Sequence, residues 1–175
     1  MLYNIPIFTG VNLEFDTLSE LSAIGNINAI KDEAELNPKQ ITRYLNATPE
    51  DFIIYNGHDT MILESSAQGG ADRIGGVLSG ASHLLGRFIR DMISTFVGGD
   101  LQNAVRMQRS LYPVLKIMGQ NSRTNPAPLW KATMAAVGVN AGLPRSPLSA
   151  GTSNEVAAIV EVLRAFAAEW PEYLQ

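Results

Sequence analysis

The chain has 175 residues, 46% of them hydrophobic and 17% charged, which is the composition of a globular protein with a light surface charge. Its net charge of −4 and the lack of a long basic run argue against nucleic acid or an anionic membrane as a partner. The sequence has no cysteine, which excludes disulfides and thiolate catalysis. The sequence shows neither a signal-peptide pattern at its start nor an apolar run of roughly 20 residues that could span a membrane, so we expect a soluble, cytoplasmic protein.

The first half of the chain alternates short apolar runs with amphipathic stretches. A strand opens the sequence and ends near Tyr3 or Asn4, because Pro6 cannot donate to a sheet ladder. Further strands are predicted over residues 27–31, 52–55 and 73–79. This alternation with helices predicts βαβ units and a parallel sheet.

Three helices are predicted between these strands, over residues 16–24, 38–45 and 61–68. Asn37 followed by Pro38 is typical of a helix N-cap with proline in the first helical position. The pair Gly69-Gly70 is expected to close the third helix.

The second half of the chain has a helical pattern only. Apolar residues recur at helical spacing over 83–97, 101–118, 128–137 and 154–169. Segments 121–127 and 142–153 are rich in Gly, Pro, Ser and Asn and predict loops. The sequence therefore predicts an α/β domain over residues 1–97 and an α-helical domain over residues 98–175.

Lys31 is the residue of greatest chemical interest, because it ends a short apolar strand and is followed by Asp32 and Glu33. In α/β folds, ligands bind and catalytic side chains project at the carboxyl ends of strands. Apolar walls there disfavour the charged form of a lysine, which leaves a neutral amine for attack on a carbonyl. The alternative is a solvated lysine that closes the strand and pairs loosely with Asp32 or Glu33.

Several motifs, in order and spacing, resemble the class I aldolases and lyases that include dihydrodipicolinate synthase, N-acetylneuraminate lyase and 2-keto-3-deoxy sugar acid aldolases. Together they extend over nearly the whole chain. The motifs are YNIP at 3–6, TGV at 9–11, AIKD at 29–32, NGHD at 56–59, GAD at 70–72, NPAP at 125–128 with Lys131, and RSPL at 145–148.

The resemblance implies an α/β fold, namely the second half of a (β/α)8 TIM barrel (strands 5–8) followed by a C-terminal helical domain. It implies that Lys31 forms a Schiff base with pyruvate or another 2-keto acid. It also implies that Tyr3 moves protons as a carbon–carbon bond to an aldehyde forms or breaks. Gly75 and Gly76 fall on the family's last strand, where backbone groups line the pocket floor; a bulge near the barrel rim is the other interpretation. No cofactor is implied.

Two positions bear on the second substrate. Phe8 stands where dihydrodipicolinate synthases usually carry an arginine that holds a carboxylate, and a phenyl ring makes no such bidentate contact. The NGHD motif, with Asn56 as a candidate substrate-binding residue, is closer to the lyase pattern, whereas NPAP with Lys131 favours the synthases. Glu35 replaces an expected glycine, and an asparagine expected near Gly80 is missing. Lys131 itself and Arg145 are expected to serve structure.

The family's glycine-threonine-threonine motif, which grips the pyruvate carboxylate, has no counterpart in these 175 residues. A half barrel exposes two sheet edges and an apolar inner face. We therefore expect a fragment or split form, completed by a complementary N-terminal half, by a second copy in a homo-oligomer, or by a longer parent chain. The alternative is a catalytically inactive half-barrel that acts as a structural or partner subunit. His58 and His83 are the only histidines, so no metal site is expected.

Overall fold

The computed structural model describes residues 1–33, 38–119 and 125–174. The chain forms two compact units, one of residues 1–79 and 93–101 and the other of residues 80–92 and 102–175. One helix, α5 (Ser82–Val97), gives its first part to the second unit and its last part to the first. The predicted domain boundary after residue 97 stays a prediction.

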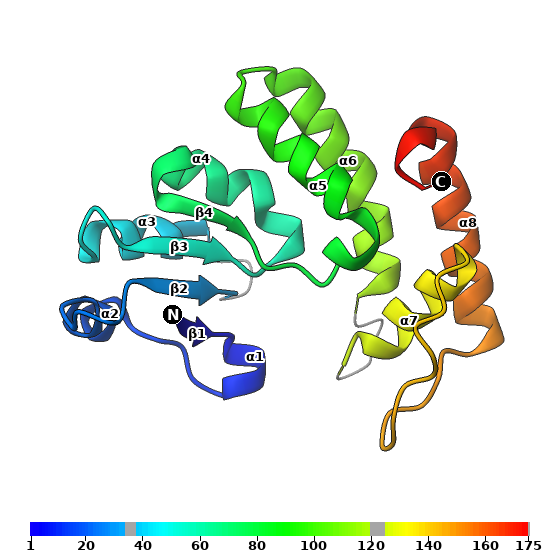
Figure 1. Cartoon of the computed structure of the whole chain (residues 1–175), viewed down its shortest axis with the longest axis horizontal. Helices are drawn as coiled ribbons and strands as arrows, with labels where there is room; N and C mark the ends of the chain where they lie inside the picture. Colours follow the sequence, from blue (N-terminus) through cyan, green and yellow to red (C-terminus); the bar gives the residue numbers. More distant parts are fainter. Residues whose placement is uncertain (34–37, 120–124, 175) are drawn as a thin grey trace. The chain divides into compact units, whose positions relative to one another are not determined.

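The first unit is built on a four-stranded parallel sheet with strand order β1-β2-β3-β4 (Figure 1). The strands are β1 (Leu2–Asn4), β2 (Ala29–Asp32), β3 (Ile53–Asn56) and β4 (Ile74–Val77). Between them run α1 (Pro6–Thr9), α2 (Phe15–Ser22), α3 (Pro38–Ala47), the 3-10 turn η1 (Asp59–Met61) and α4 (Ile62–Arg73). The predicted α/β fold with a parallel sheet is confirmed, and its assignment as strands 5–8 of a barrel stays a prediction.

Two local features differ from the sequence prediction. The segment after β1 is a short helix, α1, which Pro6 opens and Gly10 closes in the left-handed region (φ 76). The predicted end of α4 at Gly69-Gly70 is wrong, since the helix resumes after a kink at Gly70 and ends at Arg73. The predicted cap residue Asn37 and part of the predicted loop 121–127 lie outside the described residues.

Arg73 holds the extension of α4 in place. Its Nε donates to the carbonyl oxygen of Phe52 at 3.1 Å, and its Nη2 donates to Oγ1 of Thr48 at 3.0 Å. These bonds tie the last turn of α4 to the segment that precedes β3. The favourable side-chain contacts explain why the helix continues beyond a residue pair that usually ends one.

One face of the sheet is covered by helices. Ile30, Ile54 and Ile74 are in register across β2, β3 and β4. They share a buried cluster with residues of α2, α3 and the chain before β3, namely Leu18, Ile41, Tyr44 and Phe52. Because side chains alternate along a strand, the next residue of each strand projects from the opposite face.

A buried polar network lies behind the carboxyl ends of β1 and β2. Nδ2 of Asn4 donates to Oδ1 of Asp32 at 2.8 Å and to the hydroxyl of Tyr44 at 3.1 Å. Gln40 of α3 donates to the same two oxygens, each at 3.0 Å. Asn12 accepts from Asn4 at 2.9 Å and joins the loop after α1 to the network. The network therefore fixes β1 against β2 through side chains as well as backbone.

Replacing Asn4 by alanine is expected to lower the free energy of unfolding by about 1–3 kcal/mol, because buried partners lose their donor. Urea unfolding followed by circular dichroism measures this. Asn26→Ala, at an exposed turn residue, is the matched control and is expected to change little. Equal effects of the two substitutions would contradict a stabilising role for the network.

The second unit is helical. It contains the first part of α5, most of α6 (Leu101–Met118), α7 (Ala127–Ala136), α8 (Ser153–Glu169) and the 3-10 turn η2 (Pro171–Tyr173). Helix α8 begins with a capping box, in which the Thr152 and Glu155 side chains each bond the other's backbone N–H. In the part of the chain that the structure describes, no helix is both long and apolar enough to span a membrane.

An aromatic cluster joins α5, α8 and η2 inside this unit. The ring of Phe88 contacts the rings of Phe166, Trp170 and Tyr173 edge to face, at centroid distances of 4.9, 5.3 and 4.9 Å. Phe88 is fully buried. The chain end is therefore part of this unit's core.

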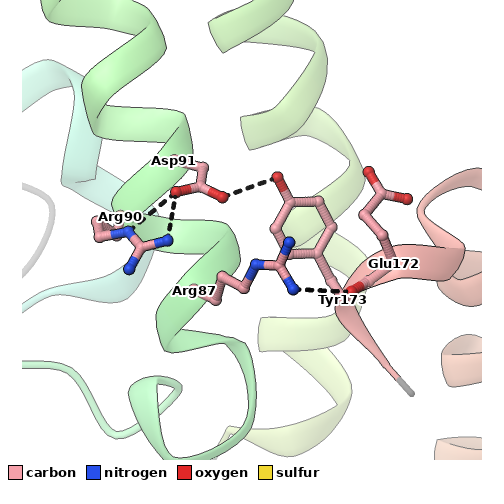
Figure 2. Close-up of polar contacts among 5 residues, drawn as sticks. All are labelled: Arg87, Arg90, Asp91, Glu172 and Tyr173. Atoms are coloured by element: carbon pink, nitrogen blue, oxygen red, sulfur yellow. Dashed lines mark hydrogen bonds and ion pairs between the residues drawn. The ribbon is translucent and has the colours of Figure 1, made fainter.

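Polar contacts around the cluster hold η2 on α5 (Figure 2). The hydroxyl of Tyr173 donates to Asp91 at 3.1 Å, and Arg87 donates to the carbonyl oxygen of Glu172 at 3.4 Å. Arg90 pairs with the same Asp91 carboxylate at 2.9 Å. Asp91 thus accepts from its own helix and from η2.

Candidate functional site

Three side chains form one row across the face of the sheet opposite the isoleucine cluster. Tyr3 of β1 is in register with Lys31 of β2, and Lys31 is in register with Tyr55 of β3. Residues in register on neighbouring strands project to the same side. The structure therefore brings the predicted pair Tyr3 and Lys31 together, and it adds Tyr55, which the sequence analysis did not single out.

The Lys31 amine lies between an aromatic ring and a carboxyl group. Its Nζ is over the Tyr3 ring, 5.1 Å from the centroid, and 3.8 Å from Oε2 of Glu33. The Lys31 side chain is only 17% exposed, whereas Tyr3 is 56% exposed. The Lys31 side chain is thus largely shielded from water, near the end of a strand whose neighbour carries an accessible aromatic ring.

Gly57, directly after β3, makes room for this arrangement. A Cβ at this position would lie 2.7 Å from Cε of Lys31 and 3.0 Å from Cβ of Glu33, closer than ordinary contacts allow. The Gly57 backbone is fixed by its N–H, which donates to the carbonyl oxygen of Asp32 at 2.7 Å. Sequence reasoning used Gly57 only as part of the NGHD motif, because the crowding becomes visible only once β2 and β3 are paired.

Glu33 has an unusual protonation equilibrium. Burial raises its pKa to about 7, against an ordinary value of 4.5; the Lys31 amine opposes this shift, while Asp59 and Asp32 add to it. Glu33 therefore carries a proton for part of the time near neutral pH. From the sequence, Glu33 was expected only as a loose ion-pair partner of Lys31.

The predicted glycines of β4 form a bulge beside this row. Tyr55 pairs with Gly76 while Ile54 pairs with Ile74, so Gly75 is the extra residue. A Cβ on Gly75 would lie 2.7 Å from Cζ of Tyr55, and Gly76 has a φ of 123°. The close approach and the bulge thus occur together at this position. A role of either glycine in binding substrate stays a prediction.

Two predicted binding residues lie outside the row. Asn56 is in register with Asp32 on the helix-covered face and is 2% exposed; its amide exchanges two 3.0 Å hydrogen bonds with the His58 backbone. Phe8 lies in α1 and is 55% exposed. The structure gives Asn56 a role in shaping the turn after β3, and its binding role, like that of Phe8, stays a prediction.

Lys131, in the second unit, donates from Nζ to the carbonyl oxygen of Ala141, in keeping with the structural role expected for it. Over residues 1–33, 38–119 and 125–174, no group of three or more His, Asp or Glu side chains is arranged to hold a metal ion.

A shielded lysine at the carboxyl end of a parallel strand, beside a tyrosine from the neighbouring strand, defines an α/β scaffold with a candidate carbonyl-binding amine. The comparisons with known proteins agree with this class. The chain belongs to the dihydrodipicolinate synthetase family, whose model matches residues 1–166. This confirms the family predicted from the motifs.

Named relatives and solved structures support the assignment. The 4-hydroxy-tetrahydrodipicolinate synthase of Desulforudis audaxviator is 42% identical over 164 residues, which are 94% of this chain and 53% of that protein. A dihydrodipicolinate synthase structure from Bacillus anthracis matches with a TM-score of 0.84 and 32% identity, over 94% of this chain and 54% of that one. The corresponding structure from Cyanidioschyzon merolae gives 0.83 and 33%, over 95% and 54%. The chain thus spans about half the length of these relatives.

Glu33→Gln is expected to change how stability depends on pH. The folded-state pKa of Glu33, about 7, lies above the ordinary 4.5, so the folded protein holds this proton more tightly than the unfolded chain. The free energy of unfolding of the wild type therefore falls as pH rises from about 4.5 to about 7, and stays low above that.

Between about pH 5 and 8, the wild type should lose roughly 1–2 kcal/mol relative to Glu33→Gln, after allowance for solvent screening. Urea unfolding across this range measures the difference. Glu50→Gln, at an exposed position, is the control and should follow the wild type. Parallel curves for the wild type and Glu33→Gln would show that burial does not raise the pKa of Glu33.

Proposed function

We propose that this chain carries the Schiff-base half of a lyase or aldolase, in which Lys31 bonds covalently to pyruvate or another 2-keto acid. The observation that carries the proposal is the Lys31 amine itself. The Lys31 side chain is 17% exposed and lies near the carboxyl end of the parallel strand β2, and its amine is over the ring of Tyr3, in a member of the dihydrodipicolinate synthetase family. The name of the relatives, 4-hydroxy-tetrahydrodipicolinate synthase, supports an enzyme of this kind.

The proposed chemistry follows from a protonated imine, which withdraws electrons from the neighbouring carbon. Lys31 attacks the keto carbon and loss of water gives the imine. Removal of a proton then gives an enamine, whose carbon bonds to an aldehyde, and the reverse sequence cleaves that bond. Tyr3, on the adjacent strand, is proposed to move the protons that these carbon–carbon steps require.

The aldehyde is the less defined substrate. Phe8 offers an exposed ring and no hydrogen-bond donor, which disfavours a carboxylate held at that point and favours a lyase or sugar-acid substrate. The relatives' names favour a synthase instead. We propose an aldehyde substrate without assigning it to either branch.

The site also needs further strands to complete the sheet around it. The four strands are proposed to be strands 5–8 of an eight-stranded barrel, and the chain covers 54% of the matching Bacillus anthracis structure. A complementary N-terminal half, or a second copy of this chain, would pair with the free edges of β1 and β4.

The alternative is an inactive half-barrel that serves as a structural or partner subunit. It is favoured by the same half-length coverage, because the relatives carry a further half that this chain does not match.

Incubation with pyruvate followed by borohydride should add one reduced pyruvate to the chain, located at Lys31 by peptide mass spectrometry, because borohydride traps the imine. Lys31→Arg should give no such adduct, since its guanidinium is not a nucleophile at neutral pH. Unmodified Lys31 in a folded wild type would favour the inactive alternative.

Tyr3→Phe distinguishes imine formation at Lys31 from the proton transfer that is proposed for the Tyr3 hydroxyl. It keeps the ring over the amine, so the borohydride adduct should still form, while turnover should fall by about 100-fold or more if the hydroxyl carries the proton. Tyr112→Phe, at an exposed tyrosine of α6, is the control. Unchanged turnover in Tyr3→Phe would remove Tyr3 from the mechanism.

Light scattering tests whether the active species contains more strands than one copy of this chain supplies. We expect the active species to be larger than a 19.0 kDa monomer, because one copy supplies four strands. A related structure, which matches 99% of this chain over 54% of its own length, is described as a monomeric dihydrodipicolinate synthase variant. A monomer of this chain with full activity would contradict the expectation.

A further inference from the structure

We propose that the carboxyl group of Glu33 is the acid–base catalyst of imine formation at Lys31, which rests on the Schiff-base function proposed above. Glu33 would give a proton to the hydroxyl group that leaves as the imine forms. It would take a proton back when the imine is hydrolysed. This role is separate from that of Tyr3, which concerns the carbon–carbon bond.

Backbone pairing fixes Glu33 beside the amine. Glu33 follows Lys31 by two residues, which places both side chains on the same face of an extended chain. Its N–H donates to the carbonyl oxygen of Asn4 at 2.9 Å, so the pairing of β1 and β2 continues through this residue. From the other side, the Gly57 backbone is so near that a Cβ there would lie 3.1 Å from Oε2 of Glu33.

The distance suits a proton transfer to the intermediate. Oε2 of Glu33 is 3.8 Å from Nζ of Lys31. In the carbinolamine that forms first, the hydroxyl oxygen is two bonds from Nζ, so this carboxyl reaches it directly or through one water. Tyr3 presents its ring face to the same amine, whereas Glu33 presents an oxygen.

The surroundings also give Glu33 a proton to donate. Its side chain is 27% exposed, and the charged groups around it are Lys31 and Asp32 of β2 and Asp59 of η1. Burial and the two aspartates outweigh the amine and raise the pKa of Glu33 to about 7. An acid–base catalyst is most effective when its pKa lies near the working pH.

Imine formation proceeds through a carbinolamine. The neutral Lys31 amine bonds to the keto carbon, and one amine proton passes to the former carbonyl oxygen, which gives a neutral carbinolamine. Glu33 in its protonated form then donates to that hydroxyl, the carbon–oxygen bond breaks, and water leaves. The nitrogen lone pair forms the carbon–nitrogen double bond, so a cationic imine remains beside a Glu33 carboxylate.

Reductive alkylation with acetone tests this step without a need for the pyruvate pocket. Acetone forms imines with amines, and cyanoborohydride traps them, so peptide mass spectrometry gives a rate for each lysine. Lys39 and Lys116 are exposed and serve as internal references within every sample. The full chain is used as the wild type, Glu33→Gln, Glu33→Asp and the exposed-site control Glu50→Gln.

The wild-type rate at Lys31 should rise with pH up to about 7 and level off above it, because the neutral amine becomes more abundant as pH rises while the protonated Glu33 carboxyl is lost above its pKa of about 7. Glu33→Gln should lower the Lys31 rate at pH 7 by about tenfold or more, let it continue to rise with pH without levelling off, and leave Lys39 and Lys116 unchanged. Glu33→Asp should keep the levelling at a reduced rate.

The opposite result would identify a purely electrostatic partner. If Glu33 only holds Lys31 as an ammonium, its removal frees the amine, and Glu33→Gln reacts as fast as the wild type or faster. That outcome, in a variant whose circular dichroism matches the wild type, overturns the proposal.

A parallel series with pyruvate tells the two proposals apart. Dependence on Glu33 with acetone but no pyruvate adduct would mean that the keto-acid function fails while the catalyst stands. A pyruvate adduct that forms at the same rate in Glu33→Gln as in the wild type would mean that the keto-acid function stands while Glu33 is not its acid–base catalyst.

Discussion

The pairing of β1 with β2 is the constraint on which the site depends. Side chains alternate between the faces of a sheet, so a shift of one residue would turn Lys31 toward the helices and bring Asp32 to the other face. The network of Asn4, Asp32, Gln40 and Tyr44 opposes this shift, because its hydrogen bonds form only on the helix-covered side. Residues on the helix-covered face of the sheet thus determine where the amine on the opposite face projects.

Crowding then gives the carboxyl group beside the amine its chemical character. The Gly57 backbone approaches both Lys31 and Glu33 and takes space that water would otherwise fill. A glutamate carboxyl in open solvent would be fully ionised at neutral pH. Here burial raises the pKa of Glu33 to about 7, so that a partly protonated carboxyl lies beside the Lys31 amine at neutral pH.

Apart from the short α1 and the 3-10 turns, the order of strands and helices was predictable from the sequence, as were the family and the pair of Tyr3 and Lys31, because apolar runs and motifs are local signals. Contacts between distant segments were not. Gly57 and Glu33 matter only once β2 and β3 are paired, and Arg73 extends α4 through contacts with residues 48 and 52. Asn56 belongs to the same NGHD motif as Gly57, which lies at the site. The Asn56 side chain nevertheless projects from the helix-covered face, because the register of β3 with β2 places it beside Asp32.

Among the residues that the structure describes, the strands of this sheet lie in chain order, so its two edges belong to the first and the last strand, β1 and β4. A piece that closes the sheet has to meet both edges. Once it has paired with one, the second edge is presented at a high effective concentration and pairs without a further encounter. A partner that closed such a sheet would therefore bind cooperatively, whereas one that reached a single edge would gain little of this affinity.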